Sequence, residues 1–267
     1  MTALTLRLEL RRSRMIALWL GVIAVAYSAI IGAMYPIILD NAAAIEDYMK
    51  IFPEALMAAF GMTGSLADPG VFFSTYIGTF LWPLIAAIAA IFLATRPVAA
   101  DVERGWSDLA LGTPLGRVRW LVASIAAQVL VLAALAAVTV AGVVVVGLVV
   151  GAAFDVGRFA AAAVILWLFA SAVAGIASVV GAVTLSRGIA AGITAAILIA
   201  MYLANVVAQL QPDIAWLADV GFFKYLATTE LVDAGMVPWA SVAVFVVTAI
   251  VGWAASLAVF ARRDLLA

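Results

Sequence analysis

Six long apolar stretches without any Asp, Glu, Lys or Arg constrain the fold of this chain more than any other feature. They cover residues 15–39, 71–95, 121–153, 159–185, 189–210 and 237–261. An α-helix needs about 20 mostly apolar residues to cross the hydrocarbon core of a bilayer. A single charged residue at the centre of such a helix costs roughly 2.5–3.5 kcal/mol on insertion scales. We therefore expect an all-α, polytopic membrane protein in which residues 1–267 form one domain with six transmembrane helices.

The composition agrees with a membrane-embedded chain and excludes several kinds of chemistry. Hydrophobic residues make up 68% of the chain and charged residues 11%, whereas soluble domains average about 25% charged residues. Cys and His are both absent, which excludes thiolate metal sites and a Ser-His-Asp arrangement. The two lysines follow Met49 and Phe223, so there is no Gly-Lys step of a phosphate-binding loop. We expect no catalytic residue, metal site or cofactor in this chain, and no nucleic-acid partner.

The positions of the basic residues predict the orientation. An even number of spans places both termini on one side of the membrane, and loops rich in Lys and Arg stay in the cytoplasm. The side of the termini holds Arg7, Arg11, Arg12, Arg14, Arg96, Arg104, Arg117, Arg119, Arg187, Arg262 and Arg263, and the other side holds Lys50, Arg158 and Lys224. The termini are therefore expected to be cytoplasmic, in a multi-pass protein of the cell inner (plasma) membrane.

Two segments on the outer side are amphipathic and precede spans two and six. In 42–61, apolar residues recur at helical spacing, and Pro53 should kink this helix or begin a second one. In 213–235, the residues Trp216, Val220 and Phe223 share a face. Each segment could either pack on the bundle as a lid or act as a gate.

A few polar groups lie inside the spans. Tyr202, Asn205 and Gln209 follow one another at i, i+3 and i+7 and so share one face of the fifth span, while Gln128 lies in the third. They could line a substrate path or a subunit interface, or could form hydrogen bonds between helices. The GxxxG patterns at 147–151 and 188–192 are interpreted as helix packing.

The cytoplasmic segment 101–120, DVERGWSDLALGTPLGRVRW, is unusually polar for this chain. It is expected to form a short helix over 101–115, which Gly112 and Pro114 end before the third span. Acidic residues flank the apolar pair Trp106 and Leu109. An exposed apolar pair of this kind favours contact with a partner protein.

The polar segment contains, in order, Glu103-Arg104-Gly105, Leu109, Leu111, Thr113-Pro114, Arg117 and Arg119. The chain ends with FARRDLLA at 260–267 and carries FPEALMAAFGMTGSLADPGVFFS at 52–74. With these motifs, nearly the whole chain resembles the permease subunits of ABC exporters of the second type, and 52–74 resembles bacterial members grouped with drug and antibiotic exporters. One departure is LADVGFFKY at 217–225, which lacks the Ser-Pro step often found before the last span.

The resemblance implies a helix that couples the permease to a separate ATPase. The residues assigned to this contact are Asp101, Glu103, Gly105, Trp106, Leu109, Pro114 and Arg117. Two copies of a cytoplasmic ABC ATPase subunit would hold ATP and magnesium, and a second permease copy, identical or homologous, would complete the complex. Residues 1–14 would form an elbow helix at the membrane surface, with Arg7, Arg11 and Arg14 on one face toward the ATPase or anionic lipid of the bilayer.

The expected activity is export of a hydrophobic or amphipathic substrate by alternating access, driven by the ATPase. Two alternatives remain open. One is a membrane anchor or signalling subunit that binds an ATPase without carrying substrate. The other is a self-sufficient facilitator, which would need a polar path through one chain.

Overall fold

The computed structural model describes residues 2–53, 56–57, 62, 64–103, 116–226 and 228–262. The prediction of an all-α chain with six spans is confirmed, because six helical segments are long and apolar enough to cross a membrane. These segments are Leu4–Asp40, Pro69–Thr95, Val118–Val149, Val156–Thr184, Arg187–Leu210 and Trp239–Arg262. Each agrees with an expected stretch, apart from the ends discussed below.

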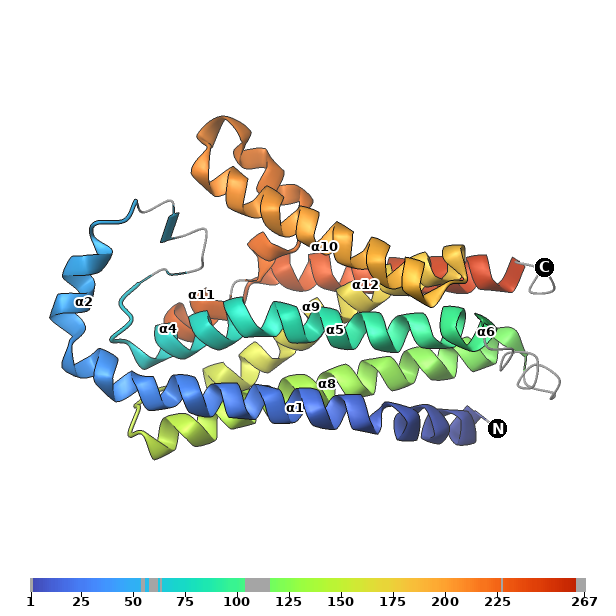
Figure 1. Ribbon diagram of the computed structural model, residues 1–267, viewed down its shortest axis with the longest axis horizontal. Helices are drawn as coiled ribbons and strands as arrows, with labels where there is room; N and C mark the ends of the chain where they lie inside the picture. The colour runs from blue at the N-terminus through green and yellow to red at the C-terminus, as the bar shows by residue number, and fades with distance from the viewer. Residues whose placement is uncertain are drawn as a thin grey trace.

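The six spans form one elongated bundle, with both chain termini at the same end (Figure 1). We call this the terminal end, and the other the opposite end. Helix α9 (Val156–Thr184) is central, since it contacts α5 (Trp82–Thr95), α8 (Arg117–Val149), α10 (Arg187–Leu210) and α12 (Trp239–Arg262). Helix α1 (Thr2–Asp40) packs mainly on α8. The far half of α10 leans away from the bundle axis (Figure 1).

The N-terminal segment is not a separate elbow helix, which corrects the expectation for residues 1–14. Helix α1 runs without interruption from Thr2 to Asp40, 39 residues, or about 58 Å at 1.5 Å per residue. The chain contains no Gly or Pro before Gly21, so nothing in the first 20 residues breaks a helix. Residues 2–14 therefore continue the axis of the first span and pack beside the bundle.

The second span is one continuous helical rod with two π-helical stretches. It runs through α4 (Pro69–Phe73), η1 (Ser74–Leu81), α5, η2 (Arg96–Ala100) and α6 (Asp101–Glu103). Pro83 and Pro97 each lack the backbone N–H that an α-helical turn requires, and both lie beside or within a π-helical stretch. Residues 101–103 of the helix predicted over 101–115 continue the second span as α6, and residues 104–115 lie outside the described residues.

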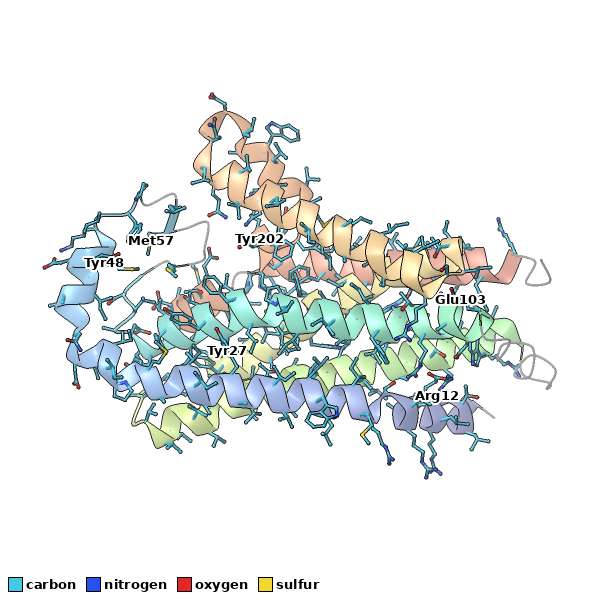
Figure 2. All side chains as sticks on the ribbon, viewed as in Figure 1. Arg12, Tyr27, Tyr48, Met57, Glu103 and Tyr202 are labelled. Carbon is cyan, nitrogen blue, oxygen red and sulfur yellow. The ribbon has the colours of Figure 1, made fainter. Side chains whose placement is uncertain are left out.

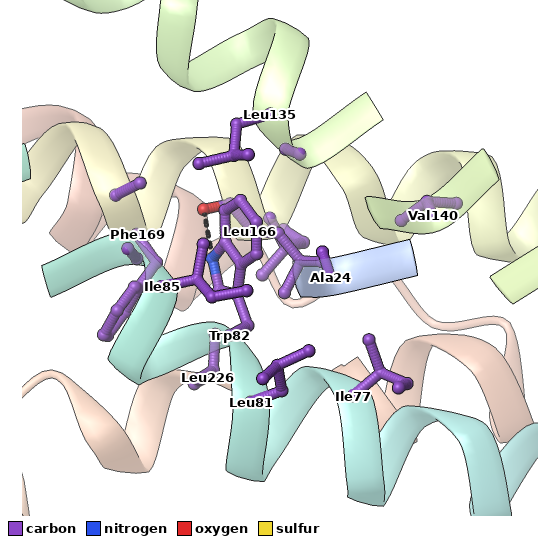
Figure 3. Packing of buried hydrophobic residues seen from close by; sticks show 14 of the residues in the cluster. Ala24, Ile77, Leu81, Trp82, Ile85, Leu135, Val140, Leu166, Phe169 and Leu226 are labelled. Carbon is purple, nitrogen blue, oxygen red and sulfur yellow. Dashed lines mark hydrogen bonds between the residues drawn. The ribbon is translucent and has the colours of Figure 1, made fainter. Parts of the chain in front are cut away.

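Trp82 anchors the second span in the core of the bundle. Its side chain is fully buried, and its indole Nε1–H donates a hydrogen bond to the Leu166 carbonyl oxygen of α9 at 2.8 Å. Figure 3 shows this indole among apolar side chains from α1, α8 and α9, including Ala24, Leu135 and Phe169. The rod is thereby fixed to the central helix near its midpoint.

Glycines allow a close approach between α9 and α12, at Gly175 and Gly252, rather than at the GxxxG pattern 188–192. A Cβ atom at Gly252 of α12 would lie 2.5 Å from the carbonyl carbon of Gly175 on α9. By contrast, Gly188 and Gly192 of the GxxxG pattern at 188–192 have no atom within 4 Å of such a Cβ. Among the described residues, this pattern therefore packs against no helix, because Gly188 and Gly192 are exposed.

The C-terminal end of α8 and both ends of α9 differ slightly from the predicted spans. Helix α8 ends at Val149 rather than near residue 153, because Gly151 adopts a φ of 72° and turns the chain. Asp155 caps α9, where its carboxylate accepts hydrogen bonds from the backbone N–H groups of Gly157 and Arg158. Helix α9 ends at Thr184, and its C-cap residue Leu185, with a φ of 51°, produces the sharp turn into α10.

The outer segments are more broken than their helical spacing suggests. Helix α2 (Ala42–Met49) ends before Pro53, whose carbonyl accepts hydrogen bonds from two following N–H groups and so begins a new turn. The rest of 42–61, including Phe60, lies largely outside the described residues. Residues 213–235 form η3 (Pro212–Val220), η4 (Phe223–Tyr225) and α11 (Thr228–Ala234).

The apolar residues predicted to share a face of 213–235 are in different surroundings. Trp216 and Val220 are exposed, whereas Phe223 packs edge-to-face against Phe169 of α9 and Tyr202 of α10. The tighter 3₁₀ turns of η3 and η4, separated by a non-helical step, remove the common α-helical face.

Candidate functional site

A cluster of buried charged and polar groups lies at the terminal end, where the second span meets α1. We call it the charge cluster. It consists of Glu9, Arg12 and Ser13 from α1, Arg96 from η2 and Asp101 from α6. Two cations and two carboxylates give it no net charge.

Arg12 and Asp101 form the first half of the cluster. The guanidinium donates from Nη1 and Nη2 to the two carboxylate oxygens of Asp101, at 2.9 and 2.7 Å. This bidentate geometry is the strongest that an Arg–carboxylate pair adopts. The Asp101 side chain is almost completely buried, whereas about a third of the Arg12 side chain is exposed. Arg12 therefore closes the cluster toward the outside.

Arg96 and Glu9 form the second half, which is buried more deeply. Arg96 Nη2 donates to Glu9 Oε2 at 2.5 Å and to Ser13 Oγ at 3.2 Å. Ser13 in turn donates its hydroxyl proton to the Glu9 backbone carbonyl at 2.8 Å. Both charged side chains are less than a tenth exposed. Arg12 Nη1 also reaches Glu9 Oε1 at 3.3 Å, so Glu9 joins the two halves.

The local sequence explains why these groups meet. Glu9, Arg12 and Ser13 follow at i, i+3 and i+4, so they share one face of α1. Arg96 comes directly after the apolar stretch of the second span and Asp101 one π-helical stretch later. Because buried charges are tolerated only when paired and hydrogen-bonded, this end of the second span is held in one position against α1.

A second contact ties the same segment to the turn between α9 and α10. Ser186 donates its hydroxyl proton to Glu103 Oε1 at 2.9 Å. Next to it, the Arg187 guanidinium lies over the ring of Phe92 in α5, 4.5 Å from its centroid, which favours a cation–π interaction. The end of α6 is therefore in contact with α1 on one side and with the α9–α10 turn on the other.

The structure describes only part of the predicted ATPase-coupling set. Asp101 is buried in the charge cluster, and Glu103 is exposed and bonded to Ser186. Arg117 is the first residue of α8. The remaining members lie outside the described residues: Gly105, Trp106, Leu109 and Pro114. Figure 2 places Arg12 and Glu103 at the terminal end.

Sequence reasoning missed the inward-facing members of the cluster. Helical spacing points to Arg7, Arg11 and Arg14, and all three are exposed. The residues that bind the second span are instead Glu9 and Arg12. A signal for them existed, because Glu9 is the only acidic residue in the first 39 positions and lies among arginines.

The polar residues inside the spans do not form one site. Tyr202 is partly exposed against Phe223, Asn205 is buried and Gln209 is half-buried, all on α10. Gln128 is buried on α8, and neither of its side-chain amide atoms has a hydrogen-bond partner among the described residues. The same holds for Asn205 Oδ1. Hydrogen bonding between helices is therefore not the role these two side chains have in this conformation.

A cavity of about 600 Å³ lies at the opposite end, between the end of α1, helix α2 and residues 62–67. Three methionines contribute to its mainly apolar lining: Met49, Met57 and Met62. Two pairs of polar side chains, one hydrogen-bonded and one ion-paired, lie at the border of this cavity. Ser65 Oγ donates to Glu46 at 2.5 Å, and Lys50 donates to Asp47 at 2.8 Å, which lowers the pKa of the Asp47 carboxyl.

Comparisons with known proteins assign no family to this arrangement. No model of a known protein family matches the chain, and no curated protein matches it either. Within the described residues there is also no group of three or more Asp or Glu side chains that could hold a metal ion. The geometry of the charge cluster is that of a structural joint, since each of its charged side chains is paired with an opposite charge.

Proposed function

We propose that this chain is the membrane permease subunit of an ATP-binding-cassette exporter, driven by a separate cytoplasmic ATPase. The proposal takes the terminal end as cytoplasmic, as the distribution of basic residues predicts. It also takes the segment after Glu103 as the ATPase-coupling segment, which the resemblance implies. The complex would contain two ATPase subunits and a second permease copy.

The observation that carries the proposal is the double attachment of the residues leading into that segment. Asp101 is bonded to α1 through Arg12, and Glu103 to the α9–α10 turn through Ser186. A force applied just beyond Glu103 would therefore act on two different spans at once. A loop that only connected two helices would not require such attachments.

The cavity at the opposite end supports the substrate class. Its apolar and methionine side chains suit a hydrophobic or amphipathic molecule, since Met is unbranched and adapts to varied shapes. A volume of about 600 Å³ lies within the range of drug-sized ligand sites. We propose that the complex moves a hydrophobic or amphipathic substrate outward across the membrane.

Purification of the tagged full-length chain from its native membrane tests the proposal. Mass spectrometry should identify an ATPase in stoichiometric amount, and Trp106→Ala should reduce its recovery at least tenfold. Glu230→Gln, at an exposed residue on α11 at the opposite end, is the control for position and should leave recovery unchanged. ATPase recovery that is equal in all three proteins would contradict the coupling assignment.

The Arg12→Gln variant tests whether binding of the ATPase and stimulation of its ATP hydrolysis depend on different contacts. Arg12 holds Asp101 but belongs to α1, so this variant should still recover the ATPase while substrate no longer stimulates ATP hydrolysis. The alternative of a non-transporting anchor or signalling subunit predicts a different result. For an anchor, even the unaltered chain should show no substrate-stimulated hydrolysis in reconstituted vesicles.

A further inference from the structure

The three exposed arginines of α1 form a stripe that no carboxylate of the described residues neutralises. Arg7, Arg11 and Arg14 follow at i, i+4 and i+7 and so lie on one face of the helix. None of the three forms an ion pair within the part of the chain that the structure describes. The nearby acids are already occupied, because Glu9 and Asp101 bind Arg12 and Arg96 inside the charge cluster.

The same face of α1 continues directly into an apolar groove. Extending the alternating steps of four and three residues from Arg14 leads to Leu18, Gly21 and Val25, which all lie on the same stripe. These three residues line an open groove of about 500 Å³ between α1 and α8. The complete lining is Ala17, Leu18, Gly21, Val22, Val25, Ala26 and Val138. The groove contains no charged or polar side chain.

Gly21 is what opens this groove. A Cβ atom at Gly21 would lie 3.5 Å from a methyl group of Val138, so a longer side chain would occupy the space. On the outer side, Leu18 and Val22 are each at least half exposed. Arg14 and Val25 are separated by about 16 Å along the helix axis at 1.5 Å per residue. Positive charge and apolar groove thus follow one another over the depth of one bilayer leaflet.

We propose that this stripe and groove form a binding site for one anionic phospholipid. The arginines bind the phosphate and the other charged groups of the headgroup, and one acyl chain lies in the groove between α1 and α8. Helix α1 runs without interruption from Thr2 to Asp40, so headgroup and chain would both contact a single helix. This lipid would support α1 from the side opposite the charge cluster.

Charge and position favour a lipid over the two other occupants. An ATPase would contact residues beyond the membrane surface, whereas the groove begins at Ala17, inside the first span. A second copy of this chain would bring its own arginine stripe and leave the positive charge uncompensated. Only a molecule with an anionic head and an apolar chain satisfies both parts of the site. The inference does not depend on the proposed transport activity.

Native mass spectrometry of the full-length chain tests the site. The purified protein is equilibrated with equal amounts of phosphatidylglycerol and phosphatidylcholine, and the retained lipid is counted. Each arginine near a surface is expected to favour the anionic lipid about fivefold, so three predict a preference of roughly a hundredfold. The triple variant Arg7→Gln/Arg11→Gln/Arg14→Gln should lose most of this preference. Arg119→Gln, an exposed arginine at the start of α8, is the matched control and should keep it.

Two variants test the groove independently of the charges. Gly21→Leu fills the groove, and Leu18→Ser makes an exposed part of its wall polar without changing the contact with α8. Both should reduce the number of retained lipids of either headgroup, while circular dichroism confirms that helix content is unchanged. Retention equal to that of the unaltered chain in both variants would overturn the acyl-chain assignment.

The two rival occupants give distinct results. If the triple arginine variant keeps its lipid preference but no longer recovers an ATPase, the stripe is a protein contact and the lipid site is wrong. The chain has no cysteine, so Leu18→Cys provides a single thiol. Efficient disulfide dimers of that variant in native membranes would show that a second copy covers the groove, which also overturns the proposal. Because the lipid assay requires neither ATPase nor substrate, its failure would not affect the proposed function.

Discussion

Replacing either partner of the Glu9–Arg96 ion pair should destabilise the protein more than replacing both. The pair is nearly buried and its atoms approach to 2.5 Å. At an effective dielectric constant of about 20, two unit charges about 4 Å apart attract by about 4 kcal/mol. Removing one partner of a buried pair typically costs about 3–5 kcal/mol because the other charge remains buried without compensation.

The two single substitutions should differ. In Glu9→Leu, Arg96 keeps only two neutral partners, the backbone carbonyl of residue 9 and the Ser13 hydroxyl. The free energy of unfolding should therefore fall by about 3–5 kcal/mol. In Arg96→Met, Glu9 still has Arg12 at 3.3 Å, and the loss should be smaller, about 2–3 kcal/mol. The double variant buries two apolar side chains instead and should lose only about 1–2 kcal/mol.

Reversible unfolding in mixed micelles, followed by circular dichroism, measures these differences. The double-mutant cycle should give a coupling energy of about 3 kcal/mol or more. The exposed pair Asp47–Lys50, with both side chains about three-quarters exposed, is the control and should show no measurable coupling because water screens it. Additive effects of Glu9→Leu and Arg96→Met would refute the argument that this pair holds the second span to α1.

Four other substitutions test helix packing and one turn of the bundle. Gly252→Ala should lower the stability by about 1–3 kcal/mol because its Cβ meets the backbone of α9 at 2.5 Å, whereas Gly192→Ala meets nothing and should not lower it; thermal unfolding of both distinguishes them. Trp82→Phe keeps one aromatic ring but loses the hydrogen bond to α9 and leaves a small cavity in the core; the lost hydrogen bond alone should cost about 0.5–1.5 kcal/mol in the same unfolding assay, and the cavity should add to that cost. Gly151→Ala should cost about 1 kcal/mol although no atom lies near its Cβ, because its φ of 72° disfavours a side chain; an unchanged midpoint would contradict this.

The spans were predictable from the sequence because the bilayer imposes a single simple rule on each of them. Any stretch of about 20 apolar residues without charge is expected to be a helix, whatever its neighbours. Helix α10, predicted at 189–210 and observed at Arg187–Leu210, illustrates how closely this rule works. Its ends are set locally, by Leu185 in the turn before it and by Pro212 after it.

The candidate site was harder to predict because its members are brought together by contacts between distant segments. Arg96 and Glu9 are 87 residues apart, and Arg12 and Asp101 are 89 apart. Periodicity along one helix shows that Arg7, Arg11 and Arg14 share a face, but it does not show which face of α1 meets the second span. The face that meets the second span depends on α1 being one helix from Thr2 to Asp40. The resemblance implies instead a separate elbow helix over residues 1–14.

The two π-helical stretches lie next to the two points at which the second span is fixed to its neighbours. Trp82 holds α5 to α9 just after η1, and Arg96 holds its other end to α1 at the start of η2. Between these points α5 is an unbroken α-helix of 14 residues. Because sharp helix bends often occur at π-bulges, η1 and η2 are the places where this rod is expected to bend most easily. If an ATPase moves the segment beyond Glu103 as proposed, the displacement would rotate α6 about η2 and reach α1 and the α9–α10 turn first. The core around Trp82 could then stay intact while the outer spans change position.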